Sequence, residues 1–253
     1  MILVSDLYQL LLDGIRADKR GLSVEVEEYN RLIRLVNQDV YDTYIKDFEN
    51  NTENSDTLGW FKVLNYSIDL TLSSGVMTGT MPENYYYIIG KPRILDGTAL
   101  RGVDRVTSLE DAVREEDYLT KATVTYPTCR VASVNSLNQL QIKVRPSTVT
   151  KIWIDYLKTP TVPFLDYYIN NTTLVKTFLP MTSTAQSLPL GCTYRSGTAG
   201  GTAVTVTSLT KDLDFDDGDI PLLLSKLVQR VGAILPDEGL VTTGMADELK
   251  TQD

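Results

Sequence analysis

Apolar residues recur at helical spacing near both ends of this 253-residue chain, whereas its middle shows strand-like alternation and Thr- and Asn-rich turns. Helical ends around a strand-rich centre favour an α+β fold, with N- and C-terminal helices packed together beside a β-rich central region. We therefore expect an N-terminal helical region over residues 1–58, a β-rich region over 59–210, and a C-terminal helix and tail over 211–253. The two terminal regions are predicted to pack as one domain.

The N-terminal region predicts two helices. The first covers residues 5–20, with Ser5 as its cap and Gly21 at its end. The second is longer, is capped by Ser23, and carries glutamates in its first turn, which suits the helix dipole. One apolar face of the first helix comprises Leu7, Leu10, Leu11 and Ile15, and the seam of the second comprises Leu22, Val26, Tyr29, Ile33, Val36 and Val40. A seam this long covers either the chain's own core or a neighbouring subunit, and we take Val26, Tyr29, Ile33 and Val36 as candidate oligomer-interface residues.

The central region carries several strand patterns. Alternation is clearest where Ile152, Ile154 and Tyr156 would face one side of a sheet. Asn170 and Asn171 predict a hairpin turn, because asparagine tolerates positive φ. The other expected strands cover residues 67–72, 85–89, 123–126, 140–144 and 203–206. Residues 108–119 predict a short helix that is capped by Ser108 and has a solvated acidic face.

Three consecutive tyrosines, Tyr85, Tyr86 and Tyr87, lie in one of the expected strands. Successive side chains of a strand point to opposite faces, so they cannot all face the same core. Tyrosine is also favoured at protein interfaces. We therefore add these three residues to the candidate oligomer interface.

A C-terminal helix is predicted from Ile220 to Gly232, with its apolar face formed by Ile220, Leu223, Leu224, Leu227, Val228 and Val231. An acidic segment over residues 212–219 precedes it. Its carboxylates alternate as in a calcium loop, but the glycine does not fall at the position that an EF-hand requires. Capping of the helix and interaction with its dipole explain the segment better, and we predict no metal site.

The chain lacks several residue types on which catalysis often depends. It has no histidine and only two cysteines, which lie far apart in sequence. Nucleophilic couples that depend on an imidazole are excluded. The glycine-rich stretch 197–201 lacks the lysine and spacing of a phosphate-binding loop. We predict no catalytic residues and no cofactor. Paired carboxylates with Trp60 and Trp153 leave open a carbohydrate-binding or carbohydrate-active protein.

The net charge of −9 disfavours a general nucleic-acid-binding surface, since such binding depends on Lys and Arg neutralising phosphates. It is compatible with a passage through which DNA slides without binding. No apolar run approaches the roughly 20 residues of a membrane span, and the first residues do not form a signal peptide. We therefore expect a protein made in the cytoplasm that does not enter a membrane.

Two stretches of the chain resemble a known class of protein. Residues 126–131 (YPTCRV), 141–146 (QIKVRP) and 152–160 (IWIDYLKTP) resemble a strand–Pro–turn–strand block of tailed-phage virion proteins. Residues 213–220 (LDFDDGDI), leading into 227–232 (LVQRVG), are similar to the C-terminal helix of neck or ring proteins of crAss-like and related short-tailed bacteriophages.

The resemblance implies a head–tail connector subunit. Such proteins form cyclic homo-oligomers, commonly twelvefold, that stack in the virion neck below the portal and contact other neck and tail proteins. DNA would pass through the lumen without specific binding, and the protein would be made in the host cytoplasm. The alternatives are a tail-associated carbohydrate-binding or carbohydrate-active protein and a generic cytoplasmic binding module.

Overall fold

The computed structural model describes residues 1–17, 24–50, 55–96, 98–117, 120–133, 139–195, 197–200 and 204–234. The chain forms two compact units. One comprises Met1–Trp60 with Pro160–Asp253, and the other comprises Phe61–Thr159. The residues expected to form one β-rich region are therefore shared between the two units. Gly21, Ser23 and Leu22, which were predicted at the junction of the first two helices, lie outside the described residues, as does most of the C-terminal tail.

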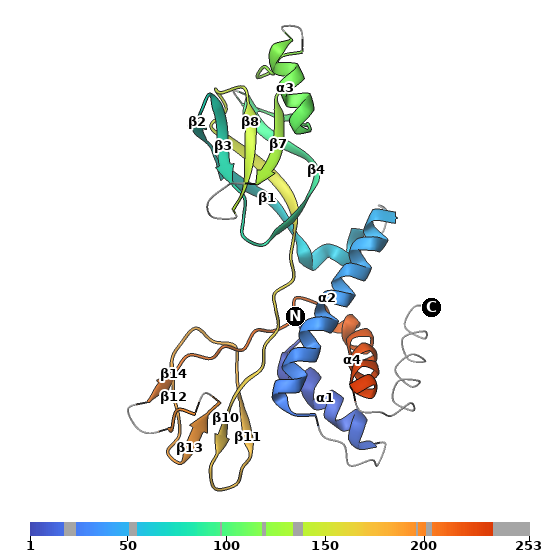
Figure 1. The fold of residues 1–253 in the computed structure, drawn as a ribbon, viewed down its shortest axis with the longest axis vertical. Helices are drawn as coiled ribbons and strands as arrows, with labels where there is room; N and C mark the ends of the chain where they lie inside the picture. The colour runs from blue at the N-terminus through green and yellow to red at the C-terminus, as the bar shows by residue number, and fades with distance from the viewer. Residues whose placement is uncertain are drawn as a thin grey trace. The chain divides into compact units, whose positions relative to one another are not determined.

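In its described residues the first unit has three α-helices, and helix α4 packs against both α1 and α2. Their bounds are Val4–Ala17 for α1, Val26–Asn50 for α2 and Ile220–Ile234 for α4, with short 3-10 helices at Ser55–Phe61 and Asp217–Asp219. Together with the strands described below, this confirms the predicted α+β fold, with N- and C-terminal helices packed together. Figure 1 shows these helices near the label N.

The helices bury most of the residues that their spacing predicts. Leu7, Leu11 and Ile15 of α1 are buried, but Leu10 is exposed. Helix α1 begins one residue before Ser5, because the Val4 N–H donates to Asp212 Oδ1 over 3.0 Å. Leu223, Leu227 and Val231 form the buried face of α4, which continues past Gly232 to Ile234.

The acidic segment before α4 does cap it. Asp216 and Asp219 form a reciprocal capping box around the 3-10 helix at Asp217–Asp219, which leads directly into α4. Asp219 also accepts a hydrogen bond from Tyr44 Oη at 2.5 Å, and Asp214 accepts one from the Thr161 N–H at 2.8 Å. These carboxylates therefore bind separate donors. In the described part of the chain, no group of three or more His, Cys, Asp or Glu side chains is placed to hold a metal ion.

A small antiparallel sheet completes the first unit. Its strand order is β11-β10-β13, and a separate two-stranded ribbon pairs β12 with β14. The bounds are Asp166–Asn170 (β10), Lys176–Leu179 (β11), Gln186–Ser187 (β12), Cys192–Tyr194 (β13) and Thr205–Val206 (β14). The hairpin predicted at Asn170 is present, but the residue with positive φ is Leu174, while Asn170 Oδ1 accepts the N–H groups of Thr172 and Thr173.

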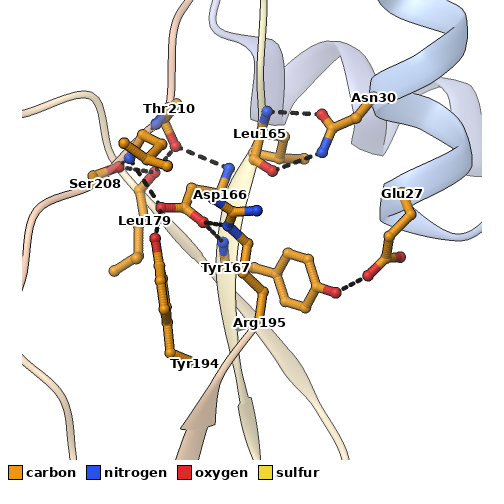
Figure 2. A network of polar contacts seen from close by, with 11 residues as sticks. Glu27, Asn30, Leu165, Asp166, Tyr167, Leu179, Tyr194, Arg195, Ser208 and Thr210 are labelled. Carbon is orange, nitrogen blue, oxygen red and sulfur yellow. Dashed lines mark hydrogen bonds and ion pairs between the residues drawn. The ribbon is translucent and has the colours of Figure 1, made fainter. Parts of the chain in front are cut away.

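The chain enters β10 through a polar network centred on the buried Asp166, which Figure 2 shows. The Asn30 amide on α2 makes two hydrogen bonds to the backbone of Leu165, donating over 3.0 Å and accepting over 2.8 Å. The next residue, Asp166, has no exposed surface and accepts four hydrogen bonds. Its donors are Arg195 Nε at 2.7 Å, Tyr194 Oη at 2.5 Å, the Leu209 N–H at 2.9 Å and the Tyr167 N–H at 3.1 Å. Because each carboxylate oxygen has two donors, Asp166 acts as a structural anchor for strands β10 and β13.

The second unit contains two sheets that share one core. A four-stranded sheet has the order β1-β9-β4-β5, and a five-stranded sheet has the order β2-β3-β8-β7-β6. All pairings are antiparallel except that of β6 with β7. The bounds are Lys62–Asp69 (β1), Thr71–Ser73 (β2), Val76–Thr80 (β3), Tyr85–Asp96 (β4), Ala99–Gly102 (β5), Asp104–Arg105 (β6), Thr128–Ser133 (β7), Leu140–Arg145 (β8) and Lys151–Lys158 (β9).

The inward residues of both sheets confirm the predicted alternation. Ile152, Ile154 and Tyr156 of β9 join Ile142 and Val144 of β8 in one buried cluster. The two sheets approach so closely at Gly79 of β3 that a Cβ there would lie 2.4 Å from Ile68 Cγ2. Residues 123–126 were wrongly predicted as a strand. They form a tight turn in which the Tyr126 N–H donates back to Thr123 O over 3.1 Å.

Both strands beside β9 are bulged near Asp155. Strand β1 gains an extra residue between Val63 and Tyr66, and β4 gains two between Ile89 and Arg93. The extra residues include Asn65 and Gly90, which have positive φ. Arg93 donates to the Asp155 carboxylate over 2.8 Å and to Asn65 Oδ1 over 2.8 Å, so one network ties the three strands together where their pairing is irregular.

Candidate interaction surface

The seam of α2 is not an exposed surface. Val26, Tyr29, Ile33 and Val36 each have an exposed fraction of 0% in the single chain. Tyr29 also packs its ring on Tyr8, with centroids 4.8 Å apart, and donates its hydroxyl to Val4 O over 2.9 Å. A second subunit cannot contact side chains that have no accessible surface. The structure therefore corrects the assignment of these four residues to an oligomer interface, and their burial in the chain's own core is the alternative that holds.

The tyrosine run of β4 lies differently from the expected alternation. Tyr85 is half-buried against Tyr156, whereas Tyr86 and Tyr87 are 44% and 45% exposed. The register explains this, since Tyr85 pairs with Lys158 and Tyr87 with the very next residue, Leu157, so that Tyr86 is the extra residue of a bulge. Two neighbouring tyrosines therefore reach the surface together. Their contact with another subunit stays a prediction.

Beside these tyrosines, Arg105 of β6 in the five-stranded sheet contacts β4 of the four-stranded sheet. Its guanidinium lies 5.2 Å from the centroid of the Tyr87 ring and donates to Ile88 O over 2.9 Å. A surface pocket of about 210 Å³ lies here, lined by Tyr85, Tyr87, Ile88, Arg105, Val106, Cys129, Arg130 and Val131. Burial raises the pKa of the Cys129 thiol to about 12, so the only thiol in the pocket stays protonated and unreactive at neutral pH.

Helix α3, Ser108–Glu116, is attached to the five-stranded sheet by charge. Asp111 is the only buried residue among its nine. Its Oδ1 lies 3.1 Å from Arg145 Nε on β8, and its Oδ2 lies 3.1 Å from the buried Arg130 Nε on β7, an ion pair rather than a well-aligned hydrogen bond. Glu115 binds the other end of the Arg145 guanidinium with both carboxylate oxygens. The acidic face that was expected to be solvated is thus, at Asp111 and Glu115, the face that packs.

A pocket beside these ion pairs has a volume of about 180 Å³. Its charged lining residues are Asp111, Arg114, Glu115, Lys121 and Arg145. Three of these five are consumed by the ion pairs that hold α3 in place. The pocket is therefore chiefly the space around the ion pairs that attach α3 to the sheet.

The opposite side of α3 is apolar and exposed. Leu109 and Val113 are four residues apart, so they share one face, and they are 76% and 58% exposed. Helices of globular proteins usually turn such a face toward the core. Figure 1 shows α3 at the end of its unit, outside both sheets. The N-terminus of α3 is capped by Thr107, not by Ser108 as predicted, and Glu110 completes a capping box. An inverted amphipathic helix of this kind is the strongest candidate interaction site.

The sequence does contain the pattern for α3, although the predicted orientation, with the acidic face in solvent, was wrong at Asp111 and Glu115. Leu109 and Val113 lie on one side of a helical projection, and Asp111 and Glu115 lie on the other. What reverses the usual orientation is the pair of arginines on β7 and β8, whose position beside α3 depends on the tertiary fold.

Comparisons with protein-family models and with curated proteins find no match for this chain. Over the described residues, no helix combines the length and apolarity needed to cross a membrane. Inference about function therefore rests on the residues and their geometry, together with the resemblance noted above.

Proposed function

We propose that this chain is a non-enzymatic structural subunit of a bacteriophage virion, which assembles into a ring in the head–tail connector below the portal. The observation that carries the proposal is α3, which holds its charged side against the sheet and turns Leu109 and Val113 outward. Exposed contiguous apolar surface is typical of protein–protein contacts.

The use of the charged groups supports a structural role. The most deeply buried carboxylate, Asp166, is saturated by four donors, and Asp111 is held between two arginines. Groups with such partners stabilise the fold, and their hydrogen-bonding capacity is already used within the chain. Buried polar groups in these positions fit a rigid assembly component.

The net negative charge of the chain is also consistent with a connector ring. A net charge of −9 disfavours retention of DNA, so the genome would pass through the lumen without binding. Cyclic assembly requires two different complementary patches on each subunit, so that the rotation from one copy to the next closes. The resemblance to connector proteins suggests twelve subunits, with the portal and other neck and tail proteins above and below.

The test is the molar mass of the purified full chain across concentrations, measured by light scattering after gel filtration, with and without the portal protein. We expect species of about twelve times the 28.2 kDa monomer, visible as closed rings by negative-stain microscopy. A chain that stays monomeric at every concentration and joins no ring when the portal is present would overturn the proposal.

A further inference from the structure

The outward side of α3 combines an apolar pair with negative charge. Leu109 and Val113 lie between Glu110 and Glu116 on the helix surface. Glu116 is exposed and makes no ion pair with any described residue. Glu110 is used in the capping box, and the backbone N–H of Thr107 lowers the pKa of its carboxyl group, so it stays charged at neutral pH. We call Leu109, Glu110, Val113 and Glu116 the α3 ridge.

One stretch of the outer side of α2, from Arg31 to Leu35, has the complementary composition. Leu35 is 51% exposed, whereas Ile33 and Val36, which lie close to it in the helix, are fully buried in the core. Arg31 and Arg34, four residues and one residue before it, are exposed as well. Neither arginine forms an ion pair with a carboxylate in the described parts of the chain. We call Arg31, Arg34 and Leu35 the α2 patch.

We infer that the α3 ridge of one copy docks on the α2 patch of a second copy of this chain. Leucine and valine of the ridge would cover Leu35, while Glu116 and Glu110 would face Arg34 and Arg31. Opposite charges around a small apolar centre select the partner and fix its orientation. Two helices in contact lie 8–10 Å apart, a distance that brings side chains at these positions together.

This inference rests on the proposed ring function and specifies its contact. Each copy of the chain carries one ridge, on its second unit, and one patch, on its first unit. The contact is heterologous, with the ridge of one copy on the patch of the next, and such a contact closes into a ring when its rotation permits. A symmetric dimer through α3 alone would use the ridge twice and leave the patch uncovered.

Charge reversal at one residue of each surface tests the inference. Glu116→Arg leaves α3 intact, because a cation suits the last turn of a helix. Arg34→Glu changes an exposed position of α2. Each variant alone brings like charges together at every contact, and we expect the concentration for half-assembly to rise about tenfold or more. A one-to-one mixture of the two variants restores opposite charges at every contact of an alternating ring, so assembly should return to the wild-type concentration.

Matched controls separate this contact from a general effect of charge. Glu83→Arg and Lys46→Glu reverse exposed charges on the same two units, outside the ridge and the patch, and should assemble like the wild type. If both Glu116→Arg and Arg34→Glu form normal rings, the inference is wrong while the ring function stands. If the mixture fails to recover assembly, the two residues do not face each other and the inference is also wrong.

Disulfide capture gives a second measurement that does not require stable rings. Both natural cysteines are buried, so engineered cysteines are the only accessible ones. Val113→Cys mixed with Leu35→Cys should give a cross-linked dimer under mild oxidation, whereas either variant alone should not. Replacing Leu35→Cys by Gln38→Cys, one turn along α2, should reduce the yield several-fold. Equal yields from both pairs, or none from either, would overturn the docking geometry. Failure of the ring function is recognised separately, by wild-type chains that form no ring even with the portal.

Discussion

Asp111 Oδ1 lies 3.1 Å from Arg145 Nε, and this ion pair attaches helix α3 to the five-stranded sheet. The side chains involved are largely shielded, with 9% of Asp111 and 19% of Arg145 exposed. Since no apolar residue of α3 is buried, the helix depends on this charge pairing for its position. The attachment therefore controls how Leu109 and Val113 are presented.

Asp111→Ala should release α3 without unfolding the sheets. The substitution leaves Arg130 and Arg145 without their shared carboxylate, and we expect a loss of about 1–3 kcal/mol from the free energy of unfolding. Hydrogen exchange should show the amides of α3 losing protection first. Glu116→Ala removes an exposed carboxylate of the same helix and should leave protection unchanged. Equal protection of α3 in Asp111→Ala and the wild type would contradict the proposed attachment.

Substitutions on the two sides of α2 should separate stability from assembly. Ile33→Ala removes fully buried methyl groups and should cost about 2–5 kcal/mol. Leu35→Ala changes an exposed side chain and should alter stability by no more than about 0.5 kcal/mol, while weakening ring formation. Urea unfolding followed by circular dichroism measures the first effect, and light scattering measures the second. A stable but monomeric Ile33→Ala would contradict the assignment of Ile33 to the core.

Local patterns were sufficient for most elements of this fold. Helical spacing placed Leu7, Leu11 and Ile15 on the buried side of α1, and alternation placed Ile152 and Ile154 on the inner side of β9. Such patterns report which residues share a face. They do not report what covers that face, and for this reason the seam of α2 was open to two interpretations until its burial was known.

The remaining features depend on contacts between distant residues. The exposure of both Tyr86 and Tyr87 follows from a bulge against β9, and the orientation of α3 follows from arginines on β7 and β8. Asp166, the centre of the best-satisfied network, is preceded and followed by apolar residues and had no local signal. Apart from the N–H of the adjacent Tyr167, its donors come from residues 28 to 43 positions away in the chain.

Asp166→Ala should destabilise the first unit strongly. The change leaves Arg195 Nε, Tyr194 Oη and two backbone N–H groups without their acceptor, which should cost about 3–5 kcal/mol. Asp166→Asn retains one acceptor oxygen and should fall between Asp166→Ala and the wild type. Asp13→Ala, an exposed carboxylate of the same unit, should be neutral. We would follow chemical denaturation by circular dichroism, and an unfolding midpoint unchanged in Asp166→Ala would refute the anchoring role.

Alkaline pH should weaken the second unit through Cys129. Burial raises the pKa of this thiol from its ordinary 9.0 to about 12, so between these values the unfolded chain loses the proton while the folded chain keeps it. The contribution of the thiol is therefore fully present below pH 9 and is lost at up to about 1.4 kcal/mol for each pH unit above it. Urea unfolding at pH 8, 9, 10 and 11, followed by Trp153 fluorescence in a Trp60→Phe background, measures the slope. Cys129→Ala should be less stable at pH 8 but should show a shallower decline, because tyrosines and lysines titrate equally in both proteins and cancel in the comparison. Parallel slopes for the two proteins would mean that the thiol of Cys129 is accessible to water in the folded state.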